Sequence, residues 1–377
     1  MPIKFTEEQL MIRDMVRDFT AREIAPRDQW MDENGFDREL FTKMVDAGIP
    51  TVPYPAEYGG AGCDFTTCTM VIEEIAKGSG SMAITLDSTW LASDLILCHG
   101  SEDQKKKYIP EAAAGKIFCF ALTEPGAGSD AAAIRSTAVR SGDGWILNGS
   151  KAWITNNDAD FYVVMAKTDP KAEAKGISAF ILPRDTEGLI VGTHENKSGL
   201  RGSTTGEISF DGVVLSADAL LGELGMGFKY AMEALDGARI SISAVSAGIA
   251  AHAMQIAKDY ANERTAFGKP IAKHQGVMFK FADMSAQLRC MDLMMYDTCA
   301  LKNACKRCTI EAAQTKLLCT EWATQICLQA QQVLGGNGCS REFHVERLVR
   351  DAKVNEIAEG TSEIQRMLIG GTVLAAN

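Results

Sequence analysis

Hydrophobic and polar residues in the first third of the chain follow a helical pattern. Near the N-terminus, one apolar face is formed by four residues at three- and four-residue spacing: Ile12, Met15, Val16 and Phe19. This pattern predicts an amphipathic helix, with Thr6 and Gln9 as a capping box at its start and Pro26 at its end. Similar patterns over residues 66–77 and 82–98 predict two more helices.

The middle of the chain has a different pattern. Short runs rich in β-branched and aromatic residues are separated by Gly, Asn and Asp, among them "GWILNG", "FYVVMAK", "GISAFILP", "GLIVGTH" and "GEISFDGVVL". Such runs predict strands and tight turns, and therefore an antiparallel sheet or barrel. No predicted helix of about ten residues separates these runs, which argues against a Rossmann domain.

The last third returns to helical spacing. One long stripe recurs about every 3.5 residues: Val277, Phe281, Met284, Leu288, Met291, Met295 and Cys299. A stripe of this length favours a helix bundle. The chain is therefore expected to belong to the α+β class, with an N-terminal helical domain (1–115), a central antiparallel β domain (116–230) and a C-terminal helix bundle (231–377).

Composition and charge narrow the functional classes. The 377 residues are 46% hydrophobic and 23% charged, which indicates a globular protein, and the net charge of −11 argues against a general nucleic-acid binder. With no apolar run of about 18 residues and no signal-peptide pattern, we expect no membrane span and no membrane partner. The 11 cysteines show no disulfide framework, which fits a cytoplasmic protein. Cys305 and Cys308 form a lone CxxC, too weak a signal to predict a metal site.

Three short segments carry candidate chemistry. Glycines in the loop "FALTEPGAGSD" (120–130) permit a tight turn whose backbone N–H groups can hold a phosphate or a polar heterocycle, although a plain structural loop fits equally well. In "WITN" (153–156), Trp153 offers a flat face and Thr155 a hydroxyl. Glu359 stands between an alanine and a glycine just before a predicted helix, either as a solvated loop charge or as a base in apolar surroundings.

Taken together, six segments give the chain a specific resemblance. They occur in the order FALTEPGAGSD (120–130), NGSKAWITN (148–156), LDGAR (235–239), ERTAFGKPI (263–271), QVLGGNG (332–338) and AEGTSEIQR (358–366). In order and spacing they resemble the acyl-CoA dehydrogenase family, from one end of the chain to the other. The resemblance implies a C-terminal four-helix bundle, bound FAD and a homotetramer.

The same resemblance implies which residues contact FAD. Those expected beside the flavin or the substrate thioester are Phe120, Leu122, Thr123, Gly128, Ser129, Trp153, Ile154 and Thr155, with Thr155 near flavin N5. Those expected to reach FAD from a neighbouring subunit are Arg264, Phe267, Gln332, Gly335 and Gly336, and the shell is completed by Thr361 and Glu363. Ala266 departs from the family pattern, where relatives often carry a hydroxyl or a larger side chain.

Simpler readings of three of these positions remain open from the residues alone. Arg264 also fits a solvated helix end, and Gly335 with Gly336 also fits a helix C-cap. Trp153 also fits an ordinary core position in the sheet.

The resemblance also assigns the catalytic base. Abstraction of a thioester α-proton requires a carboxylate more basic than its ordinary pKa of about 4.3 allows, and burial in a dry site raises that pKa. Glu359 matches the family's base, and Gly360 leaves room for the acyl chain. Some members carry the base immediately before the arginine of the LDGAR segment, where this chain has Ala238. Asp236 and Arg239 are assigned to the CoA portion of the substrate, with an i,i+3 ion pair as the alternative.

The acyl group is suggested by residues 84–93, which align with the helix at the far end of the family's acyl pocket. Trp90 should shorten that pocket, and a buried Asp87 is costly beside a long alkyl chain, so we expect a short or compact acyl group. Asp87 is either hydrogen-bonded structure or a second base acting on a cyclic enoyl-CoA. An electron-transferring flavoprotein is the expected electron acceptor. The alternatives are an enoyl-CoA reductase, an acyl-CoA oxidase and a non-catalytic thioester-binding scaffold.

Overall fold

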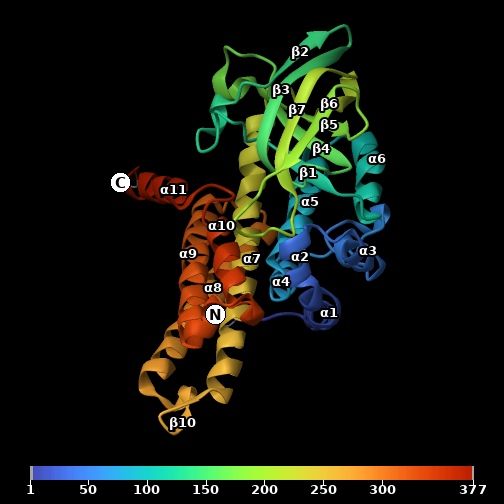
Figure 1. The fold of residues 1–377 in the computed structure, drawn as a ribbon. Coiled ribbons are helices and arrows are strands. Elements are labelled where there is room, and N and C mark those ends of the chain that lie inside the picture. The colour runs from blue at the N-terminus through green and yellow to red at the C-terminus, as the bar shows by residue number, and fades with distance from the viewer. Residues whose placement is uncertain (1–2, 376–377) are drawn as a thin grey trace.

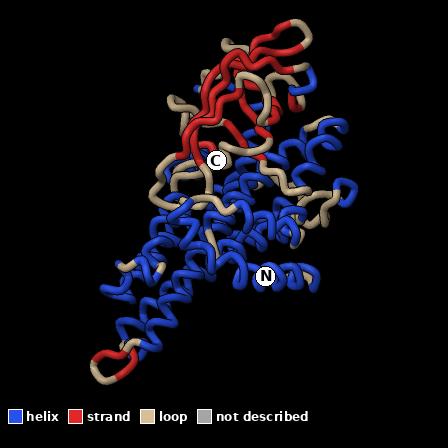
Figure 2. Tube along the Cα trace, turned by 45° about the vertical axis from the view of Figure 1, so that its right-hand side comes forward, coloured by secondary structure: helices blue, strands red, loops and turns tan. Residues whose placement is uncertain are grey.

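The computed structural model describes residues 3–375 and has three parts, a helical N-terminal part, a central sheet and a C-terminal helical part. Figure 1 shows the sheet at one end of the molecule and the long C-terminal helices running away from it. Figure 2 shows the main strands gathered together, with one small hairpin at the opposite tip. This arrangement confirms the predicted α+β class.

The N-terminal part contains six α-helices: α1 (Glu7–Phe19), α2 (Asp28–Asn34), α3 (Arg38–Asp46), α4 (Phe65–Ala76), α5 (Gly80–His99) and α6 (Glu102–Ala113). The predicted capping box is confirmed, because Thr6 and Gln9 each donate a backbone N–H to the other's side chain, at 3.0 and 3.1 Å. The prediction that Pro26 ends the first helical run is wrong. Pro26 lies at the start of a 3-10 turn, where a missing N–H needs no partner, and the chain continues into α2.

The central part is one sheet with strands β1 (Phe118–Ala121), β2 (Thr137–Ser141), β3 (Gly144–Thr155), β4 (Phe161–Lys167), β5 (Ile177–Pro183), β6 (Leu189–His194), β7 (Thr205–Leu215) and β8 (Leu220–Leu221). Its order is β6-β7-β3-β2-β4-β5-β8, with β1 against β4. The predicted all-antiparallel sheet is wrong in one respect, because β1 and β2 both pair with β4 in parallel. The β2–β3 hairpin provides the long connection that the parallel β1–β4 pair requires. Among the described residues, the helical segments between the strands of this sheet are short 3-10 turns and none is an α-helix, as expected for a fold that is not a Rossmann domain.

The C-terminal part contains the helices α7 (Gly227–Glu263), α8 (Gln275–Asn303), α9 (Thr309–Leu334), α10 (Val345–Asn355) and α11 (Ser362–Ala375), with a hairpin of β9 (Thr265–Ala266) and β10 (Lys269–Pro270) between α7 and α8. The predicted stripe on α8 is confirmed, with its methionines and Cys299 buried and the rest packed against the core. Cys305 and Cys308 are free thiols in the turn between α8 and α9.

Helix α7 is the central element of the fold. By length and composition it could cross a membrane, but 72% of its apolar window is buried inside the protein, as in the core helix of a folded domain. It packs along α9, α4 and α5. Gly248 permits the contact with α4, because an added Cβ would lie 2.5 Å from both the Ala76 Cβ and the Glu73 carbonyl oxygen. Residues on α5 and α7 are thereby brought face to face.

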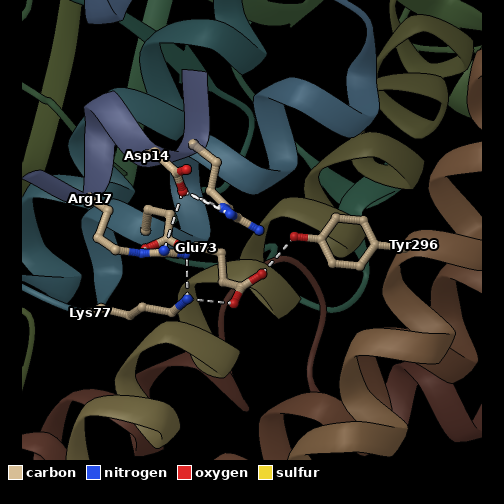
Figure 3. A network of polar contacts seen from close by, with 7 residues as sticks. Asp14, Arg17, Glu73, Lys77 and Tyr296 are labelled. Carbon is tan, nitrogen blue, oxygen red and sulfur yellow. Dashed lines mark hydrogen bonds and ion pairs between the residues drawn. The ribbon is translucent and has the colours of Figure 1, made fainter. Parts of the chain in front are cut away.

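A polar cluster, here called the Glu73 network, ties α1 and α8 to α4 (Figure 3). Lys77 Nζ lies 3.0 Å from a carboxylate oxygen of Glu73 and 2.9 Å from one of Glu74. Arg17 on α1 pairs with Glu74 at 2.9 Å, and the Tyr296 hydroxyl on α8 donates to Glu73 at 2.6 Å. Every buried acid on α4 thus has a direct partner.

Candidate active site

Glu359 lies on a tight turn between α10 and α11. Its backbone is left-handed, with φ of 54°, and the following Gly360 has φ of 90°. A left-handed conformation is unfavourable for a glutamate and is typical of positions under functional constraint. The turn is closed by the Ser362 N–H, which donates to the Glu356 carbonyl at 3.1 Å. Gln365, fully buried on α11, donates to the Gly360 carbonyl at 2.8 Å.

Glu359 is half-buried in this chain. Burial raises its pKa, and the positive charges of Lys316 and Arg239 act in the opposite direction. Glu359 has no cation beside it in sequence, but the fold brings one from α9 and one from α7. Within residues 3–375, neither cation forms an ion pair with it. The carboxylate therefore keeps the basicity that burial gives it.

Lys316 is a functional candidate that the sequence motifs missed. Its side chain is 0% exposed, and its Nζ donates to the Glu356 carbonyl at 2.9 Å. Burial lowers the pKa of Lys316 to about 8, while Glu359 and Glu356 act to raise it. The helical spacing on α9 could have identified Lys316 as buried, because it lies four residues from the buried Ala312 and four from the buried Thr320 and so shares their face of the helix.

Asp87 on α5 shares this buried space. Burial raises the pKa of Asp87 to about 7, the Ser241 hydroxyl on α7 opposes the rise, and the negative charge of Glu359 adds to it. The two carboxyl groups thus lie close enough to interact. Trp90, one turn further along α5, is buried and donates its indole N–H to the Pro50 carbonyl at 2.9 Å. That bond directs the polar edge of Trp90 to the loop before α4.

Asp236 and Arg239 on α7 form the i,i+3 ion pair considered from the sequence, at 2.7 Å. Thr309 at the start of α9 also donates to Asp236, at 2.6 Å. Arg239 is buried, and its Nε has no hydrogen-bond partner among the described residues. The guanidinium therefore lies inside the protein, where its charge acts on Glu359, and its assignment to CoA stays a prediction.

The glycine-rich loop 120–130 is braced from beneath by a buried ion pair. Lys151, 0% exposed on β3, lies 2.8 Å from Glu124 and donates to the Leu122 carbonyl at 3.0 Å. Glu124 also accepts the backbone N–H groups of Arg135 and Ser136. Burial lowers the pKa of Lys151 to about 8. Both residues stand in the quoted motifs, but neither was assigned a role there.

The candidate residues of the loop differ in their exposure. Leu122 is buried and Phe120 and Thr123 are half-buried, whereas Gly128 and Ser129 are exposed. A Cβ added at Gly128 would meet nothing within 4 Å, so the backbone there is open to a ligand.

Trp153 lies on an irregular part of β3 next to this loop. The pairing with β7 shifts register between Lys151 and Ile154, and Trp153 has φ of 60°. Its side chain is 61% exposed, so the reading of Trp153 as sheet core is wrong. Bulges of this kind commonly redirect side chains beside active sites. Ile154 is buried in the sheet, and Thr155 is half-buried opposite Thr205.

The residues expected to come from a neighbouring subunit lie elsewhere in this chain. Phe267, 95% exposed with φ of 51°, and the exposed Arg264 stand in or beside the β9–β10 hairpin, which Figure 1 shows at the end of the bundle away from the sheet. Gln332 and Gly335 line an open cavity of about 570 Å³ with Lys280. Gly335 also caps α9, so the C-cap reading is confirmed at that residue. Arg264 is exposed at the end of α7, as its alternative reading expected.

Two further candidates stand at the start of α11. Thr361 is half-buried and accepts the Ile364 N–H, whereas Glu363 is exposed. Gly336, beside the α9 cap, has open space where a Cβ would stand. The single chain therefore holds two separate groups of candidates, one around loop 120–130 and Glu359 and one at the far end of the bundle.

An exposed indole, an open glycine backbone and a braced loop together fit a large planar ligand with a polar tail. Trp153 supplies an apolar face of the size that a fused ring covers. The loop before β2 supplies backbone that a ligand can approach closely.

Comparison with known proteins gives a consistent result. Three family descriptions match consecutive parts of the chain: "Acyl-CoA dehydrogenase, N-terminal domain" over residues 6–116, "middle domain" over 119–213 and "C-terminal domain" over 225–374. The mitochondrial short-chain specific acyl-CoA dehydrogenase of Bos taurus is 42% identical over 378 residues, covering 99% of this chain and 91% of that one.

Two solved structures have nearly the same fold. Butyryl-CoA dehydrogenase from Megasphaera elsdenii superposes with a TM-score of 0.97 at 38% identity, covering 99% of this chain and 100% of that one. A chain from a structure described as the electron transferring flavoprotein of Acidaminococcus fermentans gives the same TM-score and identity, with 100% of both chains covered.

Proposed function

This chain belongs to the acyl-CoA dehydrogenase family, oxidoreductases that act on CH–CH groups, and from that premise we propose that it uses FAD to dehydrogenate a short-chain or compact acyl-CoA, with Glu359 as the base. The observation that carries the proposal is the half-buried Glu359 carboxylate, which stands on a strained turn and whose pKa is raised by burial. An ordinary surface glutamate has no cause for either property.

The residues around Glu359 perform the proton transfer. The buried carboxylate takes the α-proton of the thioester because burial has made it more basic, while Lys316 and Arg239 prevent burial from holding it permanently protonated. No protein acceptor takes the Glu359 backbone N–H within residues 3–375, so this donor is free to polarise the thioester oxygen. FAD, when bound, supplies the acceptor for the β-hydride at flavin N5, because no amino-acid side chain accepts hydride.

The cofactor is proposed to lie against the first group of candidates. Trp153 and Thr155 flank the ring, the loop of Thr123, Gly128 and Ser129 approaches it, and the Lys151–Glu124 pair keeps that loop in place. The hydroxyl of Thr361 and the side chain of Glu363 complete the shell. The exposure of Trp153 and the open backbone at Gly128 support this placement.

A short acyl group is supported by two observations. Asp87, on which the charge of Glu359 acts, and the bulky Trp90 one turn further along α5 are both buried, which supports a pocket closed on the α5 side. The bovine relative is a short-chain enzyme, and the Megasphaera protein acts on butyryl-CoA.

The decisive experiment compares Glu359→Gln with wild type by anaerobic stopped-flow titration with butyryl-CoA, following the loss of flavin absorbance. We expect the variant to keep its FAD and to bleach about 10²–10⁴-fold more slowly, the usual contribution of a positioned base. Glu356→Gln, on the same turn but paired outward with Lys353, is the matched control and should bleach normally. Undiminished bleaching by Glu359→Gln would remove the base assignment.

A second candidate function is favoured by the interaction between Asp87 and Glu359. A cyclic enoyl-CoA has no proton on its α-carbon, so its dehydrogenation would need a base at a distal ring carbon. Asp87 would take that one proton, and FAD, when bound, would accept the one hydride. Asp87→Asn should then lose activity on cyclic thioesters and keep it on straight-chain ones. Equal losses on both substrates, or none on either, would leave Asp87 a structural residue.

The partners follow from the second group of candidates. Arg264, Phe267, Gln332, Gly335 and Gly336 are exposed in this chain, and Figure 1 shows the β9–β10 hairpin, where Phe267 lies, away from the sheet. This exposure is expected if each chain completes the FAD site of another copy in a homotetramer. An electron-transferring flavoprotein is proposed as the electron acceptor and the cytoplasm as the location. The similarity to a chain described with such a flavoprotein supports the former.

A further inference from the structure

Lys316 occupies an unusual position for a charged residue. Its side chain is fully buried in the middle of α9, and its recorded partner is a neutral acceptor, the backbone carbonyl of Glu356. Burying an ammonium group beside a neutral carbonyl is costly unless a negative charge lies close by. A negative charge near Lys316 would therefore account for a lysine at this buried position.

The carbonyl that Lys316 holds is the closing point of the Glu359 turn. The Glu356 oxygen accepts both the Lys316 ammonium, at 2.9 Å, and the Ser362 N–H, at 3.1 Å. Glu359 and Gly360 lie between those two anchors, in left-handed conformations that require support. Gln365 holds the other side of the turn through the Gly360 carbonyl. Lys316 is thus the one charged group in this set of anchors.

The charges around Glu359 come from three elements. Lys316 faces it from α9, Arg239 from α7 and the Asp87 carboxyl from α5. Lys316 itself is faced by Glu359, Glu356, Arg239 and Glu321. The two cations differ in their partners. Arg239 forms an ion pair with Asp236 at 2.7 Å, whereas Lys316 has no ion pair within residues 3–375.

We propose that Lys316 is a positioning residue, which fixes the turn carrying Glu359 and, held in no ion pair within residues 3–375, supplies a positive charge that stabilises the ionised form of Glu359. The inference rests on the proposed role of Glu359 as the base. Glu356 provides a matched comparison, because its backbone is held by the buried Lys316 and its side chain by the exposed Lys353, at 2.6 Å.

The test measures the rate of anaerobic flavin bleaching by butyryl-CoA as a function of pH. Lys316→Met removes both the charge and the hydrogen bond, Lys316→Gln keeps a donor without the charge, and Lys353→Met removes the outer cation. We expect both Lys316 variants to bleach about tenfold more slowly near pH 6, with the acidic limb of the profile moved to higher pH. The difference from wild type should shrink above about pH 8, where Lys316 itself loses its charge. Lys353→Met should follow the wild-type profile.

The outcomes separate this inference from the proposed function. If wild type is not bleached, or Glu359→Gln is bleached at the wild-type rate, the proposed function fails before Lys316 enters. If those two behave as expected but the Lys316 variants slow equally at every pH, Lys316 is only a packing residue and the inference is overturned. If Lys316→Met does not fold, Lys316→Gln is the variant that tests the inference, because its amide can still donate a hydrogen bond to the Glu356 carbonyl.

Discussion

Two regions of this molecule bury glutamates in opposite ways. In the Glu73 network, the buried Glu74 meets Arg17 and Lys77 directly, at 2.9 Å each, and these partners lower its pKa despite burial. On the turn after α10, Glu359 is half-buried near two cations but forms an ion pair with neither within residues 3–375, and burial raises its pKa. The same side chain is therefore made less basic in one place and more basic in the other.

The difference lies in direct contact rather than in the number of nearby charges. Each carboxylate faces two cations, but only Glu74 has its oxygens bonded to them. A contact ion pair removes basicity, because protonation would break it, whereas a charge at a distance only moderates the effect of burial. Glu124 follows the first pattern, since its contact with Lys151 and two backbone N–H groups lowers its pKa.

The largest effect on stability should come from Lys77→Met. This change leaves Glu73 and Glu74 buried beside each other without the cation between them, and should cost about 2–3 kcal/mol of unfolding free energy. Urea unfolding followed by circular dichroism measures it. Lys43→Met, which breaks an exposed pair with Glu23, should cost less than about 0.5 kcal/mol. Equal costs for the two lysines would show that the network adds nothing beyond a surface pair.

A smaller effect distinguishes the two glutamates by the sign of the pH dependence of the unfolding free energy. Folding raises the pKa of Glu359 above its ordinary 4.5, so its ionisation opposes folding. Glu359→Gln should therefore gain stability over wild type as pH rises from 4.5 through the folded pKa, and keep that gain above it. Folding lowers the pKa of Glu74, so its stabilising contribution is present above 4.5 and lost as pH falls through the folded value. Chemical unfolding of wild type, Glu359→Gln and Glu74→Gln across pH measures both trends, and trends of the same sign would undo the comparison.

The smallest effect is expected from Tyr296→Phe. This change removes one hydrogen bond to Glu73 and leaves the Lys77 contact intact, so it should cost about 1 kcal/mol. Flavin bleaching in this variant should match wild type, because the Glu73 network contains none of the groups around Glu359. A bleaching defect would indicate that the two regions are not independent.

The sequence predicted most of the fold because its elements are encoded locally. The stripe on α8, the capping box at Thr6 and the short strand runs each depend on residues within a few positions of one another. The parallel pairing of β1 with β4 was not predictable in this way, because a strand's residue pattern does not state its neighbours' direction. Pro26 failed for a related reason, since a proline suits the first turn of a new helix as well as the end of an old one.

The candidate site divides along the same line. Glu359, Trp153 and the loop 120–130 were found because they lie in contiguous motifs. Lys316 and Ser241 were missed because each matters through a residue distant in sequence, and only the packing of α7, α9 and the α10–α11 turn brings them together. The two cations near Glu359, Lys316 and Arg239, could not be predicted from the segment around Glu359, because both come from helices distant in sequence.

The close approach of α7 to α4 at Gly248 has a consequence for how this protein tolerates change. The α4 surface that Gly248 touches includes the backbone of Glu73, and α7 carries Arg239 and Ser241 two to three turns earlier. A bulkier residue at position 248 would push α7 away from α4, and because α7 is one continuous helix the shift would reach both the Glu73 network and the groups around Glu359. In a randomised library, variants substituted at position 248 should lose thermal stability and catalytic turnover together. Selection could therefore not raise one of these properties at the expense of the other through this position.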